Sequence, residues 1–285
     1  MGLYDYREYI ANEEACRELL REIRWPDGVE CPRCSEKNIW QLGVNDNFKY
    51  KCSKCKYKFT ETTGTIFEKT RTPISKWILA IGLFKVGISA NQLKNEIKVT
   101  YKVAWQMLNK IRTAIKEDPV TNKLYGRVEV DETYYGGRRK GKRGRGASGK
   151  QPVVGIIQRN GAVRTIAIPN VKSSTLQRII RENVKKGSII YTDNWRGYRG
   201  LDKEGFNHKI INHNNEFVSD EGDHINNMEC YWRLSKHKLY ARHHNISKEY
   251  LPLYLAESDF KFNHRFHNDF IRLILSKLIQ VPLRG

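Results

Sequence analysis

Two C-x-x-C pairs near the start of the chain constrain its fold most strongly. Cys31 and Cys34 form the first pair, Cys52 and Cys55 form the second, and residues 35–51 separate them. Two thiolates in a tight turn can bind one metal ion, and two such turns complete the tetrahedral Cys₄ site of structural Zn²⁺. A redox motif would not occur in duplicate. The sequence therefore predicts a zinc ribbon, with strands at 39–42, 48–50 and 57–59.

The chain of 285 residues carries a large excess of positive charge. It has 51 Lys and Arg against 31 Asp and Glu, a formal net charge of +20. Such a surplus usually implies a polyanionic partner, and charge alone leaves DNA, RNA and an acidic membrane surface open. No apolar run is long enough to span a membrane, and the N-terminus lacks the pattern of a signal peptide. We expect a soluble cytoplasmic protein.

Residues 71–120 have the periodicity of helices. Ser89 is placed to cap a short helix at 90–97, and Thr100 to cap a longer one with apolar residues at i, i+3 and i+4 spacing. The pair resembles a helix-turn-helix, in which Lys102 and Gln106 would face a DNA groove. An ordinary helical bundle remains the alternative.

From residue 125 onward the pattern changes to β-rich runs. Strands are predicted at 127–131, 152–157, 163–168, 188–193 and 208–212, and helices at 174–184, 224–239 and 248–264. This order is expected of a ribonuclease-H-like α/β domain, a mixed five-stranded sheet with helices. We therefore divide the chain into a zinc ribbon with an N-terminal helix (1–70), a helical DNA-binding domain (71–120) and a catalytic domain (121–285).

Three acids in the last domain have the arrangement of a two-metal site. Asp131 and Asp193 are each predicted to end a strand, and Glu229 follows in a helix with Lys236 two turns later. Each acid alone would be an ordinary turn or surface residue. Together they suit phosphodiester chemistry, in which carboxylates hold two Mg²⁺ (or Mn²⁺) ions. Lys236 would bind the DNA backbone near the scissile phosphate.

The surrounding residues resemble a known family. Residues 130–137 (VDETYYGG) and 191–198 (YTDNWRGY) are similar to the first two acidic motifs of bacterial insertion-sequence transposases related to the Merlin elements. His224, Asn226, Glu229, Trp232 and Lys236, followed by FNHR at 262–265, resemble the third. Some relatives place Asn or His at the third acidic position, which leaves Asn226 as a competitor of Glu229.

The resemblance implies a DDE transposase with a ribonuclease-H-like fold and divalent metal ions. Such an enzyme would bind transposon terminal repeats and target DNA, cut and rejoin strands, and work as a homodimer or higher oligomer beside the nucleoid. Two alternatives stay open. One is a DNA-binding regulator without catalysis, built from the ribbon and the helix-turn-helix. The other is a nuclease that cuts without joining.

A glycine-rich basic run follows the first acidic motif and is predicted to bind DNA phosphates without reading sequence. The alternative is a solubilising loop. Its cations are Arg138, Arg139, Lys140, Lys142, Arg143 and Arg145. Arg242, His243 and His244 form a second, weaker candidate for DNA contact.

Overall fold

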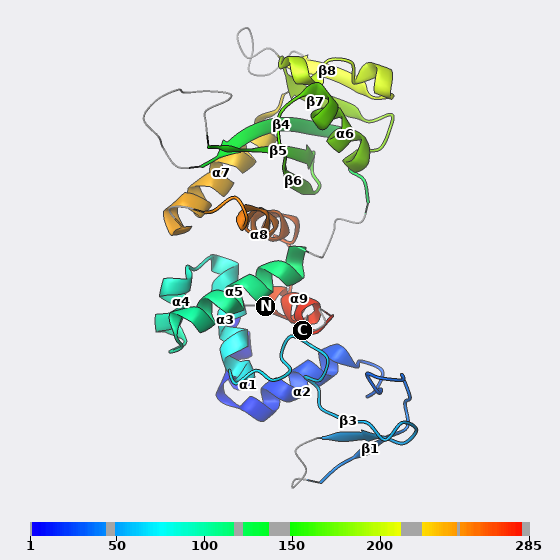
Figure 1. Ribbon diagram of the computed structural model, residues 1–285, viewed down its shortest axis with the longest axis vertical. Coiled ribbons are helices and arrows are strands. Elements are labelled where there is room, and N and C mark those ends of the chain that lie inside the picture. The colour runs from blue at the N-terminus through cyan, green and yellow to red at the C-terminus, as the bar shows by residue number, and fades with distance from the viewer. Residues whose placement is uncertain are drawn as a thin grey trace. The chain divides into compact units, whose positions relative to one another are not determined.

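The computed structural model describes residues 2–43, 49–116, 122–136, 149–211, 224–243 and 246–280. Contacts divide the chain into two compact units, residues 1–117 with 267–285, and residues 118–266 (Figure 1). Helix α9 (Phe270–Gln280), which the periodicity analysis did not identify, belongs to the first unit. The division into three domains stays a prediction. No helix in the described ranges is long and apolar enough to cross a membrane.

The N-terminal ribbon is an antiparallel sheet in the order β1-β2-β3, with bounds Ile39–Gln41, Tyr50–Cys52 and Lys58–Phe59. The rings of Tyr50 and Phe59 are buried on one face of this sheet, each 5.9 Å from the ring of Trp25. The predicted ribbon is confirmed. Strand β2 lies later than the predicted 48–50, because Ile39 pairs with Cys52, and Phe48 lies outside the described residues.

In the described residues of the first unit, a short 3₁₀ helix (Leu3–Tyr6) and five α-helices precede α9. The α-helices are α1 (Arg7–Ala11), α2 (Glu13–Arg24), α3 (Ile74–Val86), α4 (Ala90–Glu96) and α5 (Tyr101–Lys116). The hydroxyl of Ser89 accepts the N–H of Gln92, and the hydroxyl of Thr100 accepts that of Val103 at 3.3 Å, so both predicted caps are confirmed. Gly87 ends α3 with a φ of +92°, a conformation that favours glycine.

The second unit is built on a mixed five-stranded sheet, as predicted, and its strands lie in the order β6-β5-β4-β7-β8. The strands are β4 (Arg127–Tyr135), β5 (Gln151–Gln158), β6 (Val163–Ala167), β7 (Ile189–Asp193) and β8 (Asn207–Ile211). β5 pairs antiparallel with β4 and β6, whereas β7 pairs parallel with β4 and β8.

Helices cover this sheet on both faces. α6 (Ser173–Asn183) packs on the face that carries Val130 and Ile156. α7 (Asn226–His243) and α8 (Leu251–Asn263) pack against the residues of the other face, among them Val153 and Ile157 (Figure 1). The acids singled out in the sequence lie on strands and a helix of this unit.

Side chains of α8 bind the open edge of β6. The N–H of Val163 donates to Oδ1 of Asn263 at 2.8 Å, and Nδ2 of Asn263 donates to the carbonyl of Val163 at 3.0 Å. One helical turn earlier, the N–H of Thr165 donates to Asp259 at 2.7 Å. These bonds satisfy edge groups that would otherwise be available to another strand.

Candidate active site and zinc centre

Alternate residues of β4 face helix α7. The N–H of Met228 donates to the carboxylate of Glu129 at 3.0 Å, Lys236 donates to the hydroxyl of Thr133, and the hydroxyls of Tyr135 and Ser235 lie 3.2 Å apart. Asp131 occupies the same row because side chains alternate along a strand. Its carboxylate therefore points toward the helix that carries Glu229.

Glu132 points to the opposite face. Its carboxylate accepts the hydroxyl of Tyr198 at 2.7 Å within the buried interior. This opposition is what strand alternation predicts for neighbours, and it separates Glu132 from the row that contains Asp131.

The pairing of β4 with β7 brings Asp131 close to Asp193. The parallel register runs from Arg127 opposite Ile189 to Glu129 opposite Tyr191. Two further steps along both strands lead to Asp131 and Asp193, just beyond the paired residues of these neighbouring strands. Asp193 is the last residue of β7, as predicted.

The prediction that Asp131 ends its strand is wrong. β4 continues to Tyr135 because residues 132–135 pair with residues 151–154 of β5. Asp131 instead lies in the middle of β4, two residues beyond Glu129, the last residue of β4 that pairs with β7. Its side chain is only half-buried, so it can still reach a ligand.

Charge interactions link all three acids. Burial raises the pKa of Asp131 to about 7, Glu132 adds to the shift, and the negative charges of Asp193 and Glu229 act in the same direction. Glu229 is exposed in the first turn of α7. Asn226, its competitor, is the first residue of that helix, and its N–H lies 3.3 Å from Nδ1 of His224. The structure therefore brings the three predicted acids into one electrostatic neighbourhood.

A glycine permits α7 to approach the sheet closely. Gly155 of β5 is paired with Asp131, and a Cβ added there would lie 2.4 Å from Cζ2 of Trp232 and 2.5 Å from Cε of Met228. Any side chain at this position would push the helix away from β4. Gly155 therefore allows α7, the helix that carries Glu229, to pack directly against β5.

A buried ion pair fixes the start of α7. Glu129 is 0% exposed, and its carboxylate accepts Nε of Arg159 at 2.9 Å and Nδ2 of Asn227 at 2.8 Å. Arg159 also donates to the carbonyl of His224 at 2.7 Å, and its guanidinium lies 4.2 Å from the ring centroid of Tyr191. One guanidinium thus contacts β4, β7 and the segment that enters α7.

Lys236, the predicted phosphate contact, lies on α7 near Asp131 and Thr133. Burial lowers its pKa below the usual value, the carboxylate of Asp131 opposes that shift, and the ammonium of Lys150 adds to it. An ammonium held beside the acids can bind a phosphate oxygen as well as Thr133.

The four ribbon cysteines form a compact cluster. Their Sγ atoms all lie within 4.8 Å of one another, with Cys31 and Cys55, and Cys34 and Cys52, each 3.6 Å apart. A tetrahedron with zinc–sulfur bonds of about 2.3 Å requires sulfur separations of roughly 3.8 Å. The donor set and its spacing fit structural Zn²⁺.

Within the described ranges, only these cysteines bring three or more ligand atoms within reach of a single ion. The three carboxylates are not gathered around one position in this way. A pair of ions roughly 4 Å apart needs ligands spread over two positions, so this wider spacing is compatible with the predicted two-metal site.

Comparison with known proteins identifies the family. Residues 123–263 match the ISXO2-like transposase domain, and residues 11–58 match the transposase zinc-ribbon domain. The chain is 31% identical over 267 residues to a protein of the transposable element ISH50 from Halobacterium salinarum, which covers 86% of this chain and 89% of that protein. The chain belongs to the ISXO2-like transposase family. The transposase is also 42% identical over 102 residues to a transposase-like protein of Haemophilus influenzae, covering 36% of the chain and 81% of that relative.

The other predicted DNA contacts of the transposase are scattered. Lys102 and Gln106 are exposed on the first turns of α5. The basic run from Arg138 to Arg145 lies outside the described residues, as does His244.

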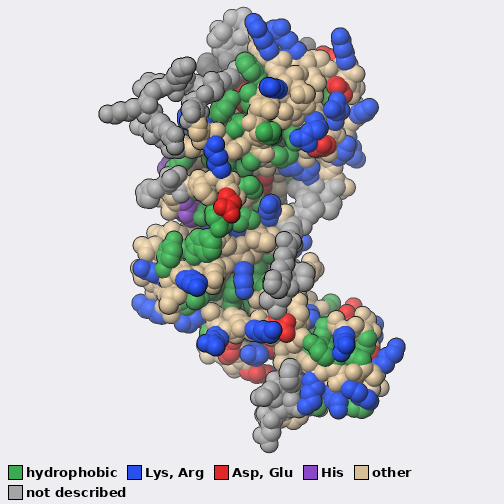
Figure 2. Space-filling view, viewed as in Figure 1, with side chains coloured by type: hydrophobic (Ala, Val, Ile, Leu, Met, Phe, Trp, Pro, Cys, Tyr) green, Lys and Arg blue, Asp and Glu red, His purple; other side chains and the backbone are tan. Residues whose placement is uncertain are grey.

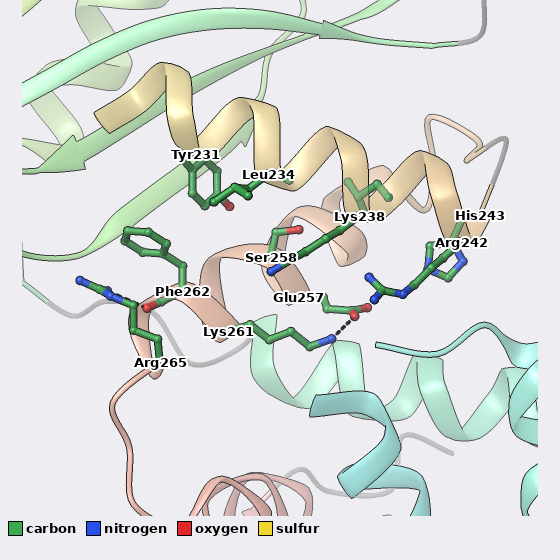
Figure 3. Close-up of a pocket in the computed structure, with 12 residues that line it drawn as sticks. Tyr231, Leu234, Lys238, Arg242, His243, Glu257, Ser258, Lys261, Phe262 and Arg265 are labelled. Carbon is green, nitrogen blue, oxygen red and sulfur yellow. Dashed lines mark hydrogen bonds and ion pairs between the residues drawn. The ribbon is translucent and has the colours of Figure 1, made fainter. Parts of the chain in front are cut away.

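Arg242 and His243 line a cavity of about 290 Å³ between α7 and α8. Arg242 points toward Glu257, which forms an ion pair with Lys261 (Figure 3). None of the three acids lines this cavity, so it is separate from the candidate active site.

Periodicity and motif spacing missed Glu129, Arg159 and Gly155. Glu129 does stand two residues before Asp131 in an apolar strand, and a buried acid at such a position signals a partner. Nothing in the sequence indicates that this partner is Arg159, thirty residues later in the turn between β5 and β6.

Proposed function

We propose that the transposase is a DDE-type enzyme with a ribonuclease-H-like catalytic unit. Asp131, Asp193 and Glu229 are its catalytic residues, and it cuts and rejoins DNA at the ends of an insertion sequence. The observation that carries the proposal is the electrostatic linkage of Asp131 to the two other acids across β4, β7 and α7. A carboxylate whose charged form is disfavoured by neighbouring negative charges, as Asp131 is, is stabilised by divalent cations.

The donor set fits hard cations. Mg²⁺ and Mn²⁺ prefer carboxylate oxygens, and two such ions would supply an activated attacking hydroxyl and charge neutralisation at the leaving oxygen. Asp131 lies on β4, which pairs with β7 and faces α7, so it is the candidate for a shared ligand. Asp193 would be a further ligand of one metal ion, and Glu229 a further ligand of the other.

Neighbouring residues would position the DNA. Lys236 would bind a phosphate oxygen next to the acids, and the basic run from Arg138 to Arg145 would bind the flanking backbone. Lys102 and Gln106 would contact a DNA groove from α5. Because strand transfer joins two element ends to a target, we propose that the active assembly is a homodimer or a higher oligomer.

A cleavage assay tests the proposal. Purified protein is incubated with a labelled terminal-repeat duplex and Mg²⁺ or Mn²⁺, and nicking and strand joining are followed on denaturing gels. Asp131→Asn, Asp193→Asn and Glu229→Gln are each expected to abolish nicking, while binding of the same duplex is kept. Glu182→Gln, which removes an acid paired with Arg178 on the exposed face of α6, is the matched control.

The outcomes separate the alternatives. Nicking that survives in the three amide variants would rule out these acids as the catalytic set. Specific duplex binding by a wild-type protein that never nicks would favour the DNA-binding regulator. Nicking without joined products would favour the nuclease if the gene that encodes this protein also lacks flanking inverted repeats.

A further inference from the structure

The zinc ribbon has an outer face that the catalytic proposal does not use. Trp40 pairs with Lys51, and Lys51 pairs with Lys58, so the three side chains form one row across β1, β2 and β3. The opposite face, with Tyr50 and Phe59, is buried. The row therefore lies on the exposed side of the sheet.

Trp40 is unusual in this row. It is 47% exposed, and among the described residues it is the only tryptophan in the set of exposed large hydrophobic side chains. The ammonium of Lys56 lies 4.5 Å from its ring centroid and that of Lys51 lies 5.7 Å away. A large aromatic ring is thus presented to solvent with two cations beside it.

Most charged residues of the ribbon are positively charged. In the described part of residues 29–59, only Glu30 and Glu36 are acidic. The basic residues are Arg33, Lys37, Lys49, Lys51, Lys54, Lys56 and Lys58. Lysine and arginine side chains gather over the ribbon, at the lower right of the view in Figure 2. The surface is complementary to a polyanion.

We infer that the row of Trp40, Lys51 and Lys58 is a binding surface for DNA strands with unpaired bases. Ammonium groups on a sheet face bind phosphates without reading sequence, and an exposed aromatic ring stacks on a base that is not already stacked in a duplex. A base that covers the ring of Trp40 would displace the ammonium of Lys56, which is then available to the adjoining phosphate. The inference rests on the proposed function, because a strand that is cut and transferred at an element end must separate from its complement there, which leaves bases unpaired.

Binding measurements on the full-length protein test this surface. Fluorescence polarisation compares a labelled single-stranded oligonucleotide with its duplex, without added Mg²⁺ or Mn²⁺. Trp40→Ala is expected to weaken single-strand binding on the order of tenfold and duplex binding much less, while Trp40→Phe retains most of the affinity. Lys51→Ala and Lys58→Ala are expected to weaken both and to lower the salt dependence of binding.

Two controls accompany these variants. Lys186→Ala removes one exposed lysine from the second unit and is expected to leave single-strand affinity near the wild-type value. Zinc content is measured for every variant, so that loss of the ribbon fold is recognised. Iodide quenching of the wild-type protein is a second readout, since a bound single strand is expected to shield Trp40.

Three results would overturn the inference. They are unchanged affinities in Trp40→Ala, equal losses on single strand and duplex, and iodide quenching that single-stranded DNA does not alter. None of these measurements requires DNA cleavage. The ribbon surface can therefore be tested even if the protein does not cut DNA through the three acids.

Discussion

The carboxylate of Glu129 and the guanidinium of Arg159, 2.9 Å apart, join the three elements that carry the acids. Glu129 lies on β4 two residues before Asp131, and it also accepts the N–H of Met228 at the start of α7. Arg159 covers the ring of Tyr191, two residues before Asp193 on β7. The pair is placed to position Asp131, Asp193 and Glu229 relative to one another.

Replacing Arg159 should weaken metal binding more than DNA binding. Substitution of a residue that orients metal ligands typically lowers metal affinity or activity by roughly 10- to 100-fold. We expect Arg159→Lys to raise the Mn²⁺ concentration needed for half-maximal nicking, and Arg159→Ala to raise it further. Metal titrations of nicking, with duplex affinity measured in parallel, check this result.

The control for that series is Arg178→Ala, which removes an exposed guanidinium from an i, i+4 pair with Glu182. It should leave the metal titration unchanged. An Arg159→Lys protein that folds normally and titrates like the wild type would show that the ion pair only stabilises the fold.

Gly155 leads to a second prediction. Gly155→Ala inserts a methyl group at 2.4 Å from Trp232, so α7 must shift or the core must repack, at a cost of about 1–3 kcal/mol in unfolding free energy. We expect lower stability in urea titrations and a larger fall in nicking than the remaining folded fraction explains. Gly43→Ala, where the added Cβ meets nothing within 4 Å, is the control. Nicking that falls only in proportion to the unfolded fraction would contradict this role.

Local patterns in the sequence predicted most elements of this fold, although not helix α9. The hydroxyls of Ser89 and Thr100 accept hydrogen bonds from backbone N–H groups in the first turns of their helices, and alternating or continuous β-rich runs mark the five strands. The end of β4 was misplaced because residues after Asp131 are polar and aromatic, yet β5 supplies their backbone partners. The local residue pattern of a strand does not indicate which other strand pairs with it.

The candidate site was predictable only in part, for the same reason. Asp131, Asp193 and Glu229 were found from strand ends, helix spacing and motif resemblance. The contacts that hold them, between Glu129 and Arg159 and between Gly155 and Trp232, join residues far apart in the chain. Their chemistry becomes visible only when the sheet register and the approach of α7 are known.

The zinc centre gives a third prediction. Because the four thiolates complete a closed tetrahedral site, the wild-type protein should bind one Zn²⁺, and Cys34→Ser should lose most of it together with the ribbon fold. Zinc analysis and the cobalt–thiolate absorption of the Co²⁺-substituted protein measure this. Cys230→Ser changes an exposed thiol outside the cluster and should keep the metal. Equal zinc content in both variants would exclude the Cys₄ assignment.

Asp259 is half-buried where α8 meets β6 and α7. Its carboxylate accepts the hydroxyl of Tyr231 at 2.6 Å and the N–H of Thr165 at 2.7 Å. Burial raises the pKa of Asp259 to about 7, against the opposite effect of these hydrogen bonds. The unfolded chain has the ordinary value near 3.8, so the folded protein retains a proton that the unfolded chain has lost between these pH values.

The stability contributed by protonated Asp259 is therefore full below about pH 4 and is lost as the pH rises through about 7. The side chain of Asp259→Asn cannot ionise. Its single carbonyl oxygen cannot accept from all the donors that converge on Asp259, and a donor left without a partner lowers the free energy of unfolding by about 1–3 kcal/mol. We expect the variant to be less stable than the wild type at pH 5, and the difference to shrink by pH 8 as the wild type loses its proton. Urea titrations across this range measure the difference. A gap that stays constant from pH 5 to pH 8 would mean that Asp259 does not titrate there.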